Sequence, residues 1–167
     1  TARSLYFTSG DSITIPTHAD LEMGTGDLTI EGWFTTDTLG SVQMIYDGRG
    51  GTNSNRVAVW ITDTNKIRLY TNNSGMGRNK DSATTITKGQ WYHFAWTRQG
   101  TTSRLFINGI QEDSWSDSVD YDAPVNNAYI GSNPEGSPLD GKVSNFRIVK
   151  GTAVYTSSFR PPTEPLT

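Results

Sequence analysis

The sequence predicts an all-β protein, an antiparallel two-sheet sandwich of jelly-roll type. Good helix formers are scarce, with 8 Ala, 8 Leu, 5 Glu and 5 Lys among 167 residues, whereas Thr, Ser, Asn, Asp and Gly number 23, 16, 11, 12 and 17. Ser, Asn and Asp compete with the helix backbone for hydrogen bonds, so this composition disfavours a helical bundle. Short alternating runs recur along the chain with turn signals roughly every 8 to 12 residues, a spacing typical of antiparallel sandwiches.

Three predicted strands open the chain. Ser4 to Phe7 and Ser12 to Ile15 flank the turn residues Ser9-Gly10-Asp11, and we expect them to pair as a hairpin. In the longer run, Leu28 to Thr35, the even-numbered positions are apolar or Gly and the odd-numbered positions carry Thr, Glu or Trp. This period of two predicts a strand with one buried face. A further strand is expected at Val42 to Tyr46.

The best-defined hairpin joins Arg56 to Thr62 and Lys66 to Thr71 through the turn Asp63-Thr64-Asn65. Alternation separates its side chains into two faces. The apolar face contains Val57, Val59, Ile61, Ile67 and Leu69. The face expected to point outward contains Ala58, Trp60, Arg68 and Tyr70.

The C-terminal half contains the longest predicted strand and the strongest turn signal. Trp91 to Gln99 is the longest strand, and Asn108-Gly109 predicts a type I′ turn, which needs positive φ at both central residues. Core packing is expected for Trp33, Trp91, Phe94 and Trp96, and a packed or hydrogen-bonded place in its strand for His93. The remaining predicted strands are Ala83 to Thr87, Arg104 to Ile107, Ile110 to Ser114, Ala128 to Ile130 and Lys142 to Val149.

Composition also limits the domain organisation and the partners. We expect one domain over residues 1–160, then a proline-containing tail or linker start over residues 161–167, since Pro161-Pro162 cannot continue a ladder. The net charge of −3 and the scattered basic residues argue against nucleic acid as a partner. No apolar run approaches the roughly 18 residues of a membrane span, so we expect no membrane insertion. With no Cys and two His, disulfide frameworks, thiolate catalysis and metal sites of sulfur or clustered His are excluded.

Six segments carry a family resemblance. In chain order they are SLYFTSGDSITIP, DLTIEGWF, KGQWYHFAWTR, RLFINGI, AYIGS and LDGKVSNFRIV. Together they resemble the concanavalin A-like lectin and glucanase superfamily, most closely its laminin-G and pentraxin-like branch. The resemblance spans nearly the whole chain and implies a jelly-roll sandwich.

The C-terminal segment adds a second resemblance. FRIVKGTAVYTSSFRPPTEPL is similar to a variant of this module found in large structural proteins of bacterial viruses, especially tail and particle-surface proteins. The resemblance implies a location on a virion surface, or more generally outside the cell. It also implies other virion proteins, or further copies of the chain, as partners.

Glucanase activity is not expected, and we predict that the chain is not an enzyme. A retaining glycosidase needs two carboxylates about 5 to 5.5 Å apart. In the glucanase branch of the superfamily that the chain resembles, these lie in an E-x-D-x-x-E pattern. None of the five Glu starts such a pattern, and Glu31 has no acidic residue two or four positions further along.

Carbohydrate binding is the function that the sequence favours. Sugar rings stack on aromatic faces, Asn, Asp and Arg groups satisfy their hydroxyls, and glycine-rich loops allow close backbone approach. The candidate ligand-binding residues are Trp60, Arg68, Tyr70, Asp47, Arg49, Asn53, Asn55, Asn72, Asn73 and Arg78. The alternative is that Trp60 and Tyr70 pack between sheets or against a loop, and that the glycines only serve turns.

No cofactor is required, but structural calcium is one option. Calcium takes six to eight oxygen ligands, which Asp-rich loops can supply. The candidate ligands are Asp11, Asp140, Asp113, Asp117, Asp120 and Asp122. Many members of the superfamily that the chain resembles carry calcium beside an acidic residue in the closing strand, where this sequence has Ser144. The alternative is a solvated acidic loop with Asx turns.

We therefore expect a non-catalytic domain that binds a cell-surface glycan or polysaccharide, displayed on a phage tail or virion surface for host recognition. Shallow single sites bind weakly, so multivalent display would supply the avidity. A purely structural virion decoration or spacer domain without a ligand is the alternative.

Overall fold

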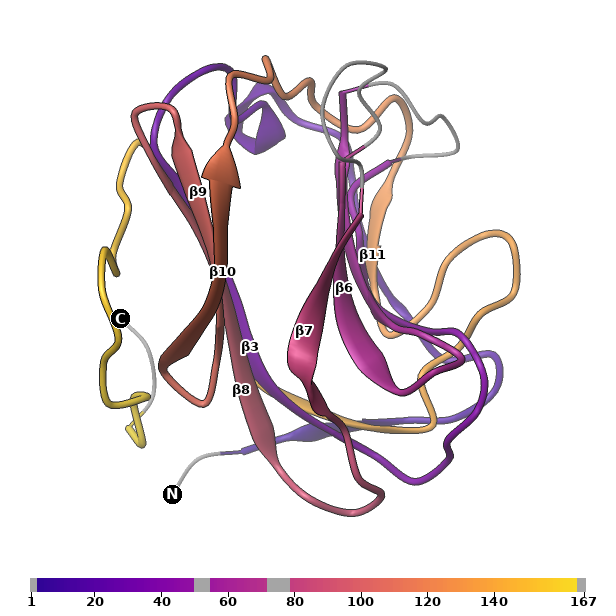
Figure 1. Ribbon diagram of the computed structural model, residues 1–167. Helices are drawn as coiled ribbons and strands as arrows, with labels where there is room; N and C mark the ends of the chain where they lie inside the picture. The colour runs from indigo at the N-terminus through magenta and orange to yellow at the C-terminus, as the bar shows by residue number, and fades with distance from the viewer. Residues whose placement is uncertain (1–2, 50–54, 72–78, 165–167) are drawn as a thin grey trace.

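The protein folds into two antiparallel sheets that face each other, which confirms the predicted sandwich (Figure 1). The computed structural model describes residues 3–49, 55–71 and 79–164. Sheet A contains, in spatial order, β1 (Leu5–Phe7), β12 (Gly141–Lys150), β3 (Leu28–Thr36), β8 (Tyr92–Gln99), β9 (Thr102–Ile107) and β10 (Ile110–Ser116). Sheet B contains β2 (Ile13–Ile15), β11 (Ala128–Ile130), β4 (Gln43–Asp47), β5 (Val57–Ile61), β6 (Lys66–Thr71) and β7 (Asn79–Thr85). Within the described ranges the only helical element is the short 3-10 turn η1 (Ala19–Leu21), and no helix is long and apolar enough to cross a membrane.

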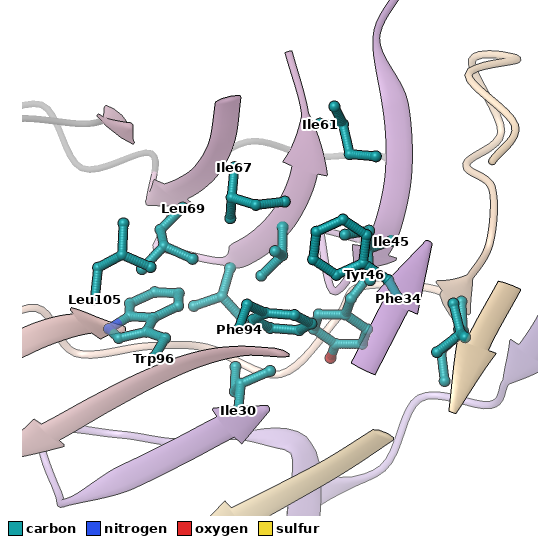
Figure 2. Close-up of a cluster of buried hydrophobic side chains, with 14 of the residues drawn as sticks. Ile30, Phe34, Ile45, Tyr46, Ile61, Ile67, Leu69, Phe94, Trp96 and Leu105 are labelled. Carbon is teal, nitrogen blue, oxygen red and sulfur yellow. The ribbon is translucent and has the colours of Figure 1, made fainter. Parts of the chain in front are cut away.

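The core lies between the sheets and is built mainly from alternate residues of the central strands (Figure 2). In β3, the even-numbered side chains Leu28, Ile30 and Phe34 are fully buried, as the alternation predicts. The predicted apolar face of β5 and β6 also points inward, whereas Trp60 and Tyr70 lie half-buried on the outside. Removal of these interdigitated apolar side chains from water is the main force that holds the two sheets together.

The predicted core role of four strand aromatics is wrong for two of them. Phe94 and Trp96 are fully buried between the sheets. Trp33, however, occupies an odd-numbered position of β3 and lies half-buried on the outer face of sheet A, and Trp91, just before β8, is 38% exposed. The residue type favoured the core, but strand alternation decides the face.

The hairpin predicted for the first two strands is also wrong. β1 pairs with β12 in sheet A, whereas β2 pairs with β11 in sheet B. The tight turn between them, in which Asp11 N donates to Thr8 O at 3.0 Å, carries the chain from one sheet to the other. Alternation and turn residues therefore identified both strands but carried no information about their partners.

The Asn108-Gly109 turn joins β9 and β10 as predicted. Both residues have positive φ, 50° for Asn108 and 77° for Gly109. A Cβ at Gly109 would lie 2.0 Å from the carbonyl oxygen of Phe159, so this position also requires glycine for space. Phe159 belongs to the C-terminal segment, which crosses this corner of the sandwich.

Residues 151–164, here called the strap, run along the outer face of sheet A (Figure 1). Val154 N donates to Thr29 Oγ1 at 2.9 Å, and Phe159 N donates to Gly109 O at 2.8 Å. The rings of Tyr155 and Phe159 stack with 3.4 Å between centroids, and Phe159 also meets Phe106 edge to face at 5.4 Å. The strap therefore covers part of a sheet face that would otherwise be solvated.

The strap continues past the domain boundary predicted at residue 160. Trp33 Nε1 donates to Pro162 O at 2.9 Å, and Asn145 Nδ2 donates to Glu164 O at 3.1 Å. Residues 161–164 thus contact sheet A, while residues 165–167 lie outside the described ranges. A linker that starts here stays a prediction.

Candidate functional site

An aromatic pair lies on the outer face of sheet B, where adjacent strands present their outward residues side by side. Trp60 on β5 is opposite Arg68 on β6, and Tyr70 on β6 is opposite Ala58 on β5. This register makes Trp60 and Tyr70 diagonal neighbours, and their ring centroids lie 5.1 Å apart. Ala58 is fully buried although it faces outward, which leaves the two larger side chains to form the surface.

Arg49 adds a positive charge to this aromatic pair. Its guanidinium carbon lies 5.8 Å from the ring centroid of Trp60 and 5.7 Å from that of Tyr70, within cation–π range. Asp47 holds it in a bidentate pair, with Nε to Oδ1 at 2.9 Å and Nη2 to Oδ2 at 2.8 Å, and Nη2 also donates to Glu135 Oε2 at 3.0 Å. Burial would lower the pKa of Arg49, but the hydrogen bonds and charges of Asp47 outweigh it and raise that pKa. Arg49 therefore stays charged and fixed in orientation.

A second bidentate pair borders the aromatic residues. Arg68 donates to both carboxylate oxygens of Asp81, at 2.6 and 2.7 Å, and these hydrogen bonds raise the pKa of Arg68. Both side chains are partly exposed, so the pair contributes little to stability but fixes the positions of its donors and acceptors. Glu135, which accepts a hydrogen bond from Arg49, is also bound by Asn133, whose Nδ2 donates to Glu135 Oε2 at 2.8 Å.

We call this surface the platform. It consists of Trp60, Tyr70, Arg49, Arg68, Asp47, Asp81 and Glu135. Its surface offers two aromatic rings, two guanidinium groups and the carboxylates of Asp81 and Glu135, whereas the carboxylate of Asp47 is buried against Arg49. Such a surface can stack with the apolar face of a sugar ring and exchange hydrogen bonds with its hydroxyls.

Five of the predicted ligand-binding residues meet on the platform: Trp60, Arg68, Tyr70, Asp47 and Arg49. Asn55 lies near the start of β5, where its carbonyl accepts a hydrogen bond from Asp122 N at 2.8 Å. The other candidates, Asn53, Asn72, Asn73 and Arg78, lie outside the described residues.

Sequence reasoning missed Asp81, Glu135 and Asn133. Asp81 could have been found because it follows the hairpin at the point where a third strand would pair with Arg68. Glu135 lies 86 residues from Arg49 along the chain, in the same loop as Asn133, and nothing local in the sequence connects this loop to Arg49.

The carboxylates proposed as calcium ligands are engaged in other contacts or separated. Asp113 lies 3.8 Å from Lys80 Nζ, and Asp122 lies 3.9 Å from Arg56 Nη2. Asp11 accepts from Thr8 N at 2.9 Å, Asp140 accepts from Tyr6 OH at 3.4 Å, and Asp120 is exposed. No three His, Asp or Glu side chains converge on a metal position within residues 3–49, 55–71 and 79–164. Structural calcium stays a prediction.

Asp117, the remaining candidate, is buried against a cation that the protein itself supplies. The fully buried guanidinium of Arg98 lies 3.7 Å from its carboxylate. Arg98 also donates to the carbonyls of Gly24, Gly26 and Val119, at 2.6 to 2.9 Å. A side chain thus neutralises this group of oxygens.

Glu31 forms a buried network beneath the strap. It accepts hydrogen bonds from Tyr155 OH at 2.9 Å and from Arg147 Nε at 3.0 Å, and His93 Nε2 lies 3.2 Å away. Glu31 and His93 are both fully buried, which confirms the packed role predicted for His93. Burial would raise the pKa of Glu31, but the bonds from His93, Arg147 and Tyr155 outweigh it and lower that pKa. An ionised, covered carboxylate of this kind holds the strap in place.

Replacing Tyr155 with phenylalanine tests this network. Loss of a hydrogen bond to a charged group is expected to cost about 1.5 to 3 kcal/mol of unfolding free energy at neutral pH. Folding lowers the pKa of Glu31, so ionised Glu31 stabilises the folded protein at pH values above the ordinary Glu pKa of about 4.3. This stabilisation is lost as the pH falls below that value. Tyr155→Phe removes one of the donors that lowers this pKa, so the variant should lose less stability between neutral and acid pH than the original protein does. Urea unfolding across this pH range measures the free energy of unfolding of both proteins, and the exposed Tyr6→Phe serves as the control. If the unfolding free energies of Tyr155→Phe and the original protein changed in parallel with pH, the prediction would be contradicted.

A laminin G-type model, described as the concanavalin A-like lectin/glucanases superfamily, matches residues 7–153. No curated protein matches the sequence closely enough to identify a relative.

Solved structures share the fold at low sequence identity. A candidate carbohydrate binding protein from Bacteroides ovatus is 17% identical with a TM-score of 0.68, and the match covers 88% of this chain and 43% of that one. The CBM40 of the Ruminococcus gnavus IT-sialidase, bound to α2,3 sialyllactose, is 13% identical with a TM-score of 0.65, covering 92% of this chain and 94% of that one. Domains LG4-5 of the mouse laminin α1 chain are 14% identical with a TM-score of 0.66, covering 98% of this chain and 48% of that one. The chain thus spans less than half the length of the first and third.

Proposed function

The chain belongs to the concanavalin A-like lectin/glucanases superfamily, and we propose that it is a non-catalytic carbohydrate-binding domain whose site is the platform on sheet B. The observation that supports this most is the fixed arrangement of Trp60, Tyr70 and Arg49. Two partly exposed aromatic rings with a charged, bidentately held arginine over them provide stacking and hydrogen bonding on one rigid sheet face. The structural similarity to the CBM40 that is bound to sialyllactose agrees with this proposal.

The charges of the platform favour a neutral ligand. Arg49 is paired with Asp47 and Glu135, and Arg68 is paired with Asp81, so neither guanidinium group offers an unpaired positive charge to a carboxylated sugar. Hydroxyl groups, in contrast, can donate to the exposed carboxylates of Asp81 and Glu135 and accept from the guanidinium groups. We therefore expect neutral oligosaccharides to bind more tightly than sialylated or uronic ones.

The proposal includes the absence of catalysis. A retaining glycosidase needs an accessible carboxylate pair about 5 to 5.5 Å apart. Glu31 is fully buried under the strap and is bound to Arg147, whereas the platform carboxylates are bound to arginines. Release of reducing sugar from a bound polysaccharide would contradict this part.

We also propose that the domain is displayed on a phage tail or virion surface. The supporting observation is the resemblance of the C-terminal segment, FRIVKGTAVYTSSFRPP, to modules of such proteins. On a multivalent particle, weak single-site binding becomes useful adhesion. A decoration domain without a ligand is the second candidate, favoured by the low exposure of Asp47 within the platform.

A glycan array with neutral and acidic sugars tests the function. We expect retention of neutral glycans by the original protein, a strong reduction of that retention in Tyr70→Ala, and full retention in Tyr6→Ala, a matched change on sheet A. No binding to any glycan, combined with incorporation into particles, would support the decoration role instead.

A further inference from the structure

A groove of about 330 Å³ lies at the end of the strap, on the outer side of sheet A. Its lining includes Ser4, Trp33, Trp91, Ser144, Asn145 and Pro162. The strands β3 and β12 contribute Trp33, Ser144 and Asn145, and the strap contributes one wall. The volume is at the small end of the range for ligand sites, which suits a short ligand.

Trp33 and Trp91 give the groove two indole rings, one fixed by contacts and one partly exposed. Trp33 is held in place, since its Nε1 donates to Pro162 O at 2.9 Å and its ring meets His93 edge to face at 5.3 Å. Trp91 is 38% exposed, a large apolar side chain that the described residues leave partly uncovered. A fixed indole and an open indole beside one groove are suited to a ring with an apolar face.

The polar lining of the groove is neutral. Asn145 has a positive φ of 49° at the bulge of β12, and its Nδ2 donates to Glu164 O at 3.1 Å. Its Oδ1 accepts no hydrogen bond from the residues that the structure describes. Ser4 and Ser144 add hydroxyl groups, of which that of Ser144 donates to Arg3 O at 2.7 Å and can still accept a hydrogen bond. Among the described residues no charged side chain lines the groove. Hydroxyls and an amide beside indoles match a neutral sugar, whereas an ionic ligand would find no counter-charge.

We propose that this groove is a second saccharide subsite, which takes a short neutral pyranose oligosaccharide against Trp91 and Trp33. It goes beyond the platform and does not depend on it, because the two sites lie on the outer faces of opposite sheets (Figure 1). The domain would therefore hold two glycan chains at once, one on each side of the sandwich.

Fluorine NMR of protein labelled with 5-fluorotryptophan tests the subsite, because the chain has five Trp and each gives one signal. Trp→Phe variants assign the signals, and Tyr70→Ala removes the platform contribution. In this background, titration with cellotetraose, maltotetraose and chitotetraose at millimolar concentrations should shift the signals of Trp33 and Trp91 with at least one of the three. Trp91→Ala should weaken the binding seen at Trp33 by about tenfold or more, and the exposed control Ile110→Ala should leave it unchanged.

Three outcomes would overturn the subsite. The first is that none of the three sugars causes a saturable shift at Trp33 or Trp91. The second is that the affinity seen at Trp33 is unchanged by Trp91→Ala. The third is that these signals respond only to a proline-rich peptide titrated in the same way. The last would indicate that the groove binds a polyproline segment and not a saccharide. The signal of Trp60 in the original protein reports on the platform separately, so either site can fail without the other.

Discussion

Trp60→Ala is expected to weaken binding of a neutral glycan to the platform by about thirtyfold or more, equivalent to about 2 kcal/mol, the loss typical of a central aromatic contact. The substitution removes the stacking surface and one of the two rings beneath Arg49. Because Trp60 lies half-buried on the outside of sheet B, we expect the variant to fold. Isothermal titration with the glycan selected on the array measures the dissociation constant.

Two further variants separate stacking from general destabilisation. Trp60→Phe keeps an aromatic face and should retain part of the affinity, whereas Tyr6→Ala, an exposed aromatic on sheet A, should retain all of it. Equal dissociation constants for Trp60→Ala and the original protein would show that the glycan binds elsewhere.

The largest stability effect is expected at Arg98. Arg98→Met leaves the buried Asp117 without its cation and three backbone carbonyls without their donor. Breaking a buried ion pair in this way typically costs about 3 to 5 kcal/mol, a large part of the roughly 5 to 15 kcal/mol by which domains are stable. Urea unfolding measures the change in free energy.

Arg68→Met is the matched control for Arg98→Met. It removes the same functional group from a partly exposed ion pair with Asp81, so its cost should stay within about 1 kcal/mol. If Arg98→Met were as mild as this control, the buried ion pair would not be a main stabilising element of this end of the sandwich.

Features of the fold that depend on local sequence could be predicted. The period of two in β3, β5 and β6 assigned their faces, and Asn108-Gly109 identified its turn, because both depend on residues close together in the chain. The sheet partners of β1 and β2 could not be predicted, since β1 pairs with residues more than a hundred positions away. The strap was missed for the same reason, because its contacts with Thr29, Thr97 and Glu31 join distant segments.

The same distinction between local and long-range features applies to the candidate site. Alternation placed Trp60, Arg68 and Tyr70 on one outward face, and the structure brings them together. The role of Glu135 depends on how a distant loop folds back, which no periodicity reveals. Trp33 shows the opposite error, because its residue type was weighted above the alternation that correctly places it outside.

Glycan binding by the platform is tested most directly by backbone amide NMR of the 15N-labelled domain during titration with the array-selected glycan. We expect the largest saturable shifts on sheet B to fall on the strands of the platform, around Trp60, Arg68 and Tyr70, and to disappear in Trp60→Ala. Platform amides that stay unchanged while amides elsewhere saturate with the glycan would contradict it.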